Sequence, residues 1–354
     1  MIQHRIDQGL LLARTTRNLR LSQILHRVRL RAQRWPPARP VVSTLLSRAP
    51  RVSGAASAWP AGFHPIDHQA GDGHPSAEDN ASGRFRFLNE LRYLGDRRDW
   101  SQPDASRLWR FHFHYFDWAW SFARHQDPAW ARSAFGGLWR SWNESVPFGT
   151  GDAWSPYVAS VRAWALCGVY RALVAGTDLD QEMVGSLGRH ASFLRWHLEH
   201  DVGGNHLVKN LKALVGLAML LEDARLSKVA TAALQRQLAV QILADGGHYE
   251  RSPSYHCQVL GDLIDIAGLL AAGGRPAVPD LAGAIEAMRR WLGLMLMPDG
   301  DVPLFNDCVL VGPSRVALLG PGPPPTDRLT VLASSGYVVI RPGARLHLVA
   351  DVGD

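Results

Sequence analysis

The chain has 354 residues, of which 46% are hydrophobic, so it can bury one large domain or two ordinary ones and is not globally disordered. Its net charge of +6 comes from the N-terminal arm, because residues 1–39 contain nine arginines and one acidic residue, Asp7. The charge therefore does not predict nucleic acid as a partner. Three scattered cysteines argue against a disulfide framework. The sequence contains no run of 18 apolar residues, so we predict no transmembrane helix.

Residues 1–34 are predicted to form a basic amphipathic helix. Leu10, Ile24 and Val28 can share one apolar stripe between the arginines, which is typical of a helix with one buried side. We expect this helix to dock on the body of the protein, and the rival interpretation is contact with a membrane surface. The apolar stretch at residues 10–13 is too short for a clear signal peptide. The sequence does not decide whether the protein is in the cytoplasm or in the periplasm of a bacterium.

A linker and a long helical region follow. Residues 35–84 are rich in proline and glycine and are predicted to form an extended linker. From residue 105 to 298, helical patterns alternate with short breaks that contain Gly, Asp or Pro. The predicted helices cover residues 116–124, 128–143, 155–175, 179–199, 206–223, 227–243, 255–272 and 280–297. Helices of this length joined by short turns favour an α/α toroid, which we assign to residues 85–320.

The last segment, residues 327–354, is predicted to begin a β-sandwich. Residues 329–332, 336–340 and 346–351 are rich in β-branched residues and indicate short strands. Two or three strands cannot bury a sheet face alone, so we expect this segment to be poorly supported as a domain. The predicted fold class is mainly α: an incomplete α/α toroid followed by the first strands of a truncated antiparallel β-sandwich.

The densest group of titratable side chains lies at residues 245–256, Asp-Gly-Gly-His-Tyr-Glu-Arg-Ser-Pro-Ser-Tyr-His, between two predicted helices. The adjacent glycines permit a turn with positive φ, and Ser252 can cap the helix that follows. Tyr255 and His256 then lie in the first turn of that helix, where its dipole favours an anion. The cluster is therefore a candidate site for chemistry.

Asn205, in a Gly-Gly-Asn-His segment, can cap the next helix or donate hydrogen bonds to a substrate carboxylate. In residues 108–118, alternation places Arg110, His112 and His114 on one side and aromatic residues on the other. The two histidines resemble a metal pair, but no third ligand is evident nearby. We therefore predict a polar groove wall, with no metal and no cofactor. Trp154, Tyr157 and Arg162 extend the same chemistry.

Four segments together resemble the N-terminal domain of the heparinase II/III family. They are Arg-Phe-Leu-Asn at 86–89, Leu-Trp-Arg-Phe-His-Phe-His-Tyr-Phe-Asp at 108–117, Asn-His at 205–206 and the cluster at 245–256. They occur in the family's order, and the last is the most specific. The resemblance implies an α/α toroid followed by a β-sandwich, and a lyase that eliminates uronic-acid polysaccharides such as heparan sulfate or alginate-like chains.

The resemblance also implies roles for single residues. Elimination beside a uronate needs a masked carboxylate, a base for the C5 proton and an acid for the leaving oxygen. Asn205, together with His206, would mask the carboxylate, and Tyr255 would act as base, acid or both. A phenol with a pKa of about 10 needs a cationic neighbour to be a base near neutrality. His256, Arg251 and the helix N-terminus would supply it. The remaining residues expected to bind substrate are Arg110, His112, His114, Tyr115, Trp154, Tyr157, Arg162, His248, Tyr249 and Glu250.

The family also has a catalytic histidine in its β-sandwich, and the sequence ends before such a segment, so we expect this chain alone to be weak or inactive. Two other interpretations stay open. One is an α/α-toroid glycoside hydrolase that uses Glu250 with Asp301 or Asp307. The other is a non-catalytic saccharide-binding or exopolysaccharide-assembly protein. The expected partner is an anionic polysaccharide, and the sequence predicts no oligomeric state.

Overall fold

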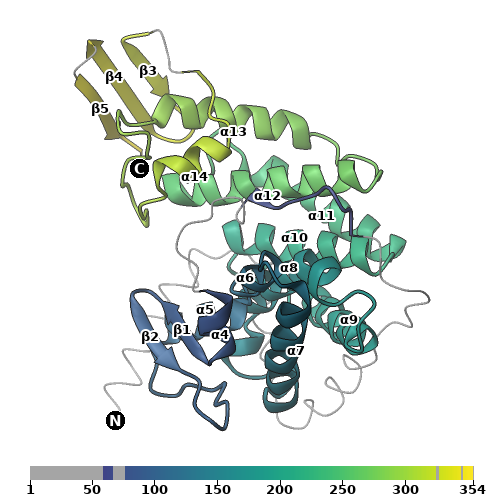
Figure 1. The fold of residues 1–354 in the computed structure, drawn as a ribbon. Coiled ribbons are helices and arrows are strands. Elements are labelled where there is room, and N and C mark those ends of the chain that lie inside the picture. Colours follow the sequence, from purple (N-terminus) through teal and green to yellow (C-terminus); the bar gives the residue numbers. More distant parts are fainter. Residues whose placement is uncertain (1–58, 67–75, 324–326, 344–345, 354) are drawn as a thin grey trace, which may run out of the picture.

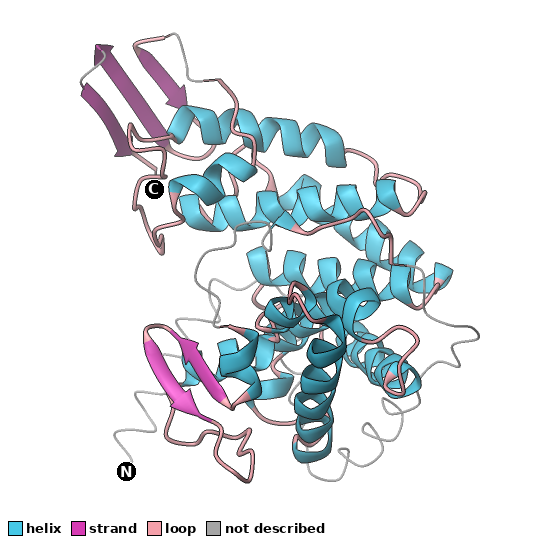
Figure 2. Cartoon of the chain, viewed as in Figure 1, coloured by secondary structure: helices cyan, strands magenta, loops and turns pink. Residues whose placement is uncertain are grey.

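The structure is a computed structural model that describes residues 59–66, 76–323, 327–343 and 346–353. The predicted basic helix at residues 1–34 and most of the predicted linker lie outside these ranges. The described part is mainly helical and contains two small antiparallel sheets, and it has no parallel sheet (Figures 1 and 2). The mainly α class is therefore confirmed. Within the described residues, no helix is both long enough and apolar enough to span a membrane.

Several helices begin where the sequence supplies a cap or a proline. Asp127 accepts two backbone N–H bonds at the start of one helix, Ser106 accepts one at the start of another, and Pro156 and Pro253 are the first residues of two more. The helices are α4 (Ala77–Ala81), α5 (Arg107–Tyr115), α6 (Ala119–Ala123), α7 (Pro128–Ser145), α8 (Pro156–Leu173), α9 (Asp180–Trp196), α10 (Gly204–Leu220), α11 (Ala224–Gln241), α12 (Pro253–Ala272), α13 (Leu281–Met295) and α14 (Pro313–Leu318).

Helix α10 lies at the centre of the body. It contacts α8, α9, α11 and α12, and nearly all of its side chains are buried, including the polar Asn210 and Lys212. A helix that is covered on every side is expected at the middle of a layered helical fold. Its N-terminal turn carries Asn205 and His206, so a deeply buried element holds two of the predicted catalytic residues in place.

The predicted alternation at residues 108–118 is wrong, because most of this segment belongs to helix α5. The helical period places Trp109 and Phe113 on the buried face, and Arg110 and His114 lie one turn apart. The Phe113 ring lies 4.9 Å from the Trp100 ring. The aromatic residues of this segment therefore build the core.

Part of the predicted linker is folded. Helix α4 lies within it, and Trp59 is buried, with its ring 5.4 Å from that of Trp164. A β-hairpin that the sequence did not predict follows, formed by β1 (Arg84–Phe87) and β2 (Glu90–Tyr93). Its Phe85 side chain packs against Phe113, which attaches the hairpin to the aromatic core.

The predicted C-terminal strands match the structure as β3 (Leu329–Leu332), β4 (Tyr337–Gly343) and β5 (Leu346–Asp351), in the order β3-β4-β5. This sheet lies beside α13, at the far end of the molecule from the hairpin (Figure 1). One face packs on α13 through Leu332, Tyr337 and Val339, which join Trp291 and Met295 in a small second core. On the sheet, Leu329, Val331 and Leu348 are exposed. The expectation of a poorly supported sheet is thus wrong for its covered face.

Candidate active site

A cleft of about 350 Å³ is lined by residues of α5, α8, α10, α12 and α14 and by residues 309–311. Aromatic, amide and cationic side chains share its wall: His112, Tyr115, Tyr157, Lys209, Tyr255 and Gln258. Four of the predicted site residues, from three different helices, therefore meet in one cleft. Of the residues predicted to build a polar groove wall, His112 and Tyr157 line this cleft and the others do not, and a helix supplies His112.

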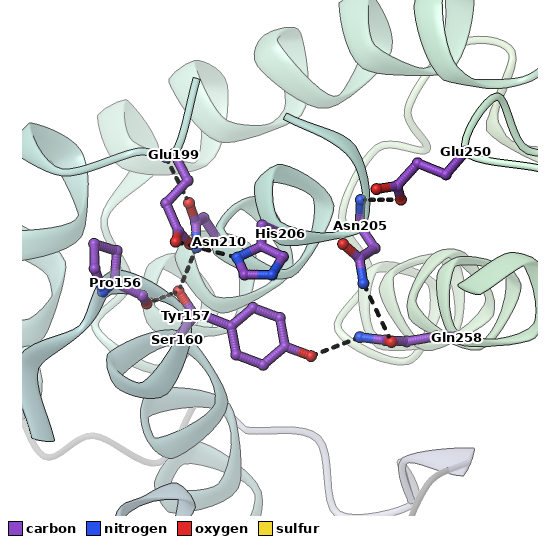
Figure 3. A network of polar contacts seen from close by, with 9 residues as sticks. All are labelled: Pro156, Tyr157, Ser160, Glu199, Asn205, His206, Asn210, Glu250 and Gln258. Carbon is purple, nitrogen blue, oxygen red and sulfur yellow. Dashed lines mark hydrogen bonds and ion pairs between the residues drawn. The ribbon is translucent and has the colours of Figure 1, made fainter. Parts of the chain in front are cut away.

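Gln258 links the cleft to Asn205. Its Nε2 donates to the Tyr157 hydroxyl at 2.6 Å, and its Oε1 accepts from Asn205 Nδ2 at 3.4 Å (Figure 3). Gln258 stands one turn after Tyr255 on α12, so the two side chains share a face of that helix. Gln258 therefore joins Asn205 to Tyr157, and Tyr255 lines the same cleft one helical turn away.

His206 is held by a carboxylate. Its Nδ1 lies 3.1 Å from Glu199 Oε1, and its ring lies 4.5 Å from the Tyr157 ring. Since a carboxylate accepts, Nδ1 donates to Glu199, and in the neutral tautomer with this proton Nε2 is the acceptor. The other Glu199 oxygen accepts from Asn210, whose side chain is fully buried (Figure 3). Glu199 and Asn210 thus fix the orientation and tautomer of the imidazole.

Glu250 caps helix α10. Its Oε2 accepts from the backbone N–H of Asn205 at 3.0 Å, whereas the N-cap residue is Gly203, not Asn205 as the sequence suggested. Gly204 has φ +51, and a Cβ there would lie 2.5 Å from the Glu250 carboxylate. Only glycine therefore leaves room for this contact. Burial, the largest cause, raises the pKa of Glu250, and the hydrogen bond from Asn205 opposes this shift.

Tyr255 lies in the first turn of α12, as predicted, but its surroundings do not match the prediction. Burial raises its pKa, and the nearby Asp307 and Glu250 carboxylates raise it further. Of the cations expected to lower it, His256 points into the core, where its Nε2 lies 3.0 Å from the Met288 carbonyl oxygen. The phenol thus stays protonated near neutrality, which suits a proton donor better than a base.

Two lysines at the cleft are paired with buried carboxylates. Lys209 Nζ lies 2.6 Å from Asp262, and Lys212 Nζ lies 2.8 Å from Asp262 and 2.6 Å from Asp265. The side chains of Lys212 and Asp262 are fully buried. These four residues connect α10 to α12 below the cleft, so the two helices that carry Asn205 and Tyr255 are locked together.

Three residues predicted to bind substrate lie in the core behind the cleft. His114 accepts a hydrogen bond from Trp142 Nε1 at 3.1 Å, and burial lowers its pKa to about 3. The fully buried Arg162 donates to the carbonyl oxygens of His114 and Ala153. Trp154 is 6% exposed and stacks on Arg162. The prediction that His114, Arg162 and Trp154 contact substrate directly is therefore wrong, because almost none of their side-chain surface is exposed to a ligand.

His248 and His256 are also buried, and the same correction applies to them. His248 Nε2 lies 3.0 Å from Gln241 Oε1, and burial lowers its pKa to about 4. The His256 ring stacks 4.2 Å from Trp291, and burial lowers its pKa to about 3. Both imidazoles are neutral near pH 7, and they hold the 245–256 segment against its neighbours.

Three other predicted residues lie at the surface. Arg110 makes a two-pronged ion pair with Asp152 at 2.8 and 2.9 Å, which neutralises it. Tyr249 is 37% exposed. Arg251 has a left-handed backbone, and its guanidinium packs against Gly353. None of the three lines the cleft.

Sequence inspection missed Gln258, Glu199 and Asn210. Only Gln258 could have been found from the sequence, because it lies one turn after Tyr255 on the predicted helix and so shares its face. Glu199 and Asn210 could not be found, because a carboxylate in a loop and an amide inside a helix are common surface features. In the described part of the chain, no group of three or more His, Cys, Asp or Glu could hold a metal ion.

The fold is that of heparinase-like polysaccharide lyases. A crystal structure of heparinase III superposes with a TM-score of 0.65, at 17% identity, over 86% of this chain and 56% of that one. The heparan sulfate lyase HepC from Pedobacter heparinus gives 0.55 at 18% identity, over 92% and 57%. These likenesses support the predicted incomplete α/α toroid.

Residues 86–317 match the family model described as heparinase II/III N-terminus, so the chain belongs to the heparinase II/III family. A curated relative, FtsZ-localized protein C of Caulobacter vibrioides, is 28% identical over 265 residues, which are 73% of this chain and 45% of that protein. The chain thus spans about half the length of the proteins that it matches.

Proposed function

We propose that this chain is the helical part of a polysaccharide lyase that cleaves uronic-acid polysaccharides, heparan-like or alginate-like, by β-elimination. The observation that carries the proposal is that Gln258 joins Asn205 to Tyr157 by hydrogen bonds, while Gln258, Tyr157 and Tyr255 line one cleft. The partner is an anionic polysaccharide, and family membership supports the reaction class.

The geometry supports the following proposed roles. The second amide proton of Asn205 would hydrogen-bond the uronate carboxylate and reduce its charge. His206, with its Nδ1 proton on Glu199, would accept the C5 proton at Nε2. Tyr255, whose pKa is raised, would donate its proton to the leaving glycosidic oxygen. The cleaved C–O bond leaves a C4–C5 double bond, and the C5 proton ends on the base.

The experiment is an assay of the 354-residue chain on heparan sulfate and on alginate. A lyase produces an unsaturated uronate that absorbs in the ultraviolet. New reducing ends without this absorbance would instead indicate the hydrolase alternative. That alternative is weakened because Asp301 is buried and accepts from the backbone N–H groups of Val302 and Gly312. Only Asp307 is then left to pair with Glu250.

A second candidate is saccharide binding without turnover. It is favoured by the surroundings of Tyr255, where the neighbouring charges that shift its pKa are acidic. The curated relative is named for localisation with FtsZ, so a binding role for this chain at places where FtsZ is found belongs to this candidate. Saturable binding of a uronate polysaccharide without any product would support it, and imaging of a fluorescent fusion would test the location.

A further inference from the structure

Ser335, in the turn between β3 and β4, and Tyr337, the first residue of β4, hydrogen-bond to the two ends of the loop that precedes α12. At one end, Asp245 Oδ2 accepts from the backbone N of Ser335 at 2.7 Å and from its Oγ at 2.9 Å. At the other end, the Tyr337 hydroxyl donates to the Arg251 carbonyl oxygen. Ser335 and Tyr337 are both fully buried. Two residues of the turn and strand therefore hold a loop of seven residues by its two ends.

Further contacts hold the loop at residues 245–251 against the sheet and α13. Trp291 Nε1 donates to Ser335 Oγ at 2.9 Å, and a Cβ on Gly247 would lie 2.7 Å from the Ser335 side chain. Asn306 Nδ2 donates to the Arg251 carbonyl oxygen at 2.8 Å. The loop thus packs without a gap against the sheet and α13, so a shift of the turn would move the loop.

The loop at residues 245–251 contains Glu250, whose carboxylate accepts a hydrogen bond from the backbone N–H of Asn205. It also leads directly into the first turn of α12, where Tyr255 lies. Both sides of the candidate site therefore depend on where this loop sits. Neither Ser335 nor Tyr337 lines the cleft, so their effect on a substrate would be indirect.

We infer that Ser335 and Tyr337 are positioning residues, which set the loop at 245–251 and, through Glu250, the first turn of α10. The C-terminal sheet would then help to position the residues of the candidate site, although it lies outside the helical body. The consequence for saccharide affinity rests on the proposed function, whereas the consequence for the loop does not.

The test compares Ser335→Ala and Tyr337→Phe with Tyr93→Phe, which removes a hydroxyl from an exposed residue of the distant hairpin. Amide hydrogen exchange is followed by mass spectrometry. Because each substitution removes buried hydrogen bonds at the loop, it should speed exchange in residues 245–256 and 203–207 by roughly fivefold to tenfold. Helix α7 should keep its wild-type rate, and Tyr93→Phe should change neither segment.

Unchanged exchange in residues 245–256, or an equal rise there and in α7, would overturn the inference. Ser335→Ala removes a single oxygen, so this variant alone tests the positioning role if Tyr337→Phe does not fold. A second measurement titrates heparan sulfate oligosaccharide, with affinity expected to fall about tenfold in both variants. A wild-type chain that binds no uronate saccharide would contradict the proposed function, and the exchange result would then decide the positioning role alone.

Discussion

Asn205 and Glu250 lie 45 residues apart in the chain, and a 3.0 Å hydrogen bond joins the Asn205 backbone N to the Glu250 carboxylate. The first N–H groups of a helix have no partner within it. Glycine at the N-cap has no side chain to supply one, so a residue from a distant loop does so. The helix that carries Asn205 is thereby tied to the loop that leads to Tyr255.

Gly204→Ala should break this tie. The residue has φ +51, and its new Cβ would collide with the Glu250 carboxylate at 2.5 Å. We expect the free energy of unfolding to fall by about 2 kcal/mol, since a left-handed backbone alone costs roughly 1–2 kcal/mol for alanine. Urea denaturation measures it. Gly185→Ala is the control, because that site in α9 has open space and no positive φ. Equal stability of the two variants would contradict the argument.

Tyr255→Phe should abolish elimination while leaving saccharide binding nearly intact. The substitution removes only the hydroxyl that is proposed to protonate the leaving oxygen, so kcat should fall about 10²–10⁴-fold. The assay follows the ultraviolet absorbance of the unsaturated product, and a separate titration measures the affinity. Tyr93→Phe, on the exposed hairpin, should match the wild type. Full activity in Tyr255→Phe would remove this residue from the mechanism.

Asp307→Asn should shift the alkaline limb of the pH–rate profile to lower pH. The Asp307 carboxylate disfavours the Tyr255 phenolate and so helps to raise its pKa, after burial. Without that charge the Tyr255 phenol ionises at lower pH, so the proton donor is lost, and the rate falls, at a lower pH than in the wild type. The measurement is kcat/KM against pH, with Asp178→Asn as the control, because that carboxylate is exposed, pairs with Arg140 and is not among the charges that shift the pKa of Tyr255. A limb that moves to higher pH would mean that Tyr255 is not the group that titrates.

His256→Gln should make the protein less sensitive to acid. The folded-state pKa of His256 is lowered to about 3 from the 6.5 of a free imidazole. The unfolded chain therefore binds the proton first, and this group's stabilising contribution is complete above pH 6.5 and is lost as the pH falls towards 3. One such group changes the stability by about 1.4 kcal/mol per pH unit in that window.

The measurement is urea denaturation between pH 7 and pH 4, and the variant should show the shallower loss of stability. His125→Gln is a control of opposite sign. A hydrogen bond to Glu78 raises the His125 pKa, so its contribution is present at low pH and is lost as the pH rises. Identical slopes for the wild type and His256→Gln would show that the buried imidazole is not the group that titrates.

The helical fold was predictable because its signals are local. The spacing of apolar residues, together with Pro156 and Pro253, marks helices to within a few residues. The C-terminal strands were found for the same reason. The hairpin at residues 84–93 was missed because a short two-stranded unit, stabilised by contacts of Phe85 with Phe113, has no signal of its own.

The site was predictable only in part. The cluster at 245–256 indicated the right region, and Tyr255 does line the cleft. Its histidines were expected to contact substrate, but burial is a property of the packed fold, and neither composition nor spacing shows that His248 and His256 face inwards. Gln258 was missed because its importance comes from two hydrogen bonds to residues on other helices.

The contacts of Ser335 and Tyr337 also affect where the molecule can be divided. The change in sequence pattern near residue 320 suggests a boundary between two domains, but hydrogen bonds and the packing of Trp291 cross it. A chain shortened before Leu329 would bare Trp291 and Met295 on α13. The helical body and the sheet should therefore melt in one calorimetric transition, and a version trimmed at the apparent boundary should be less soluble than the whole.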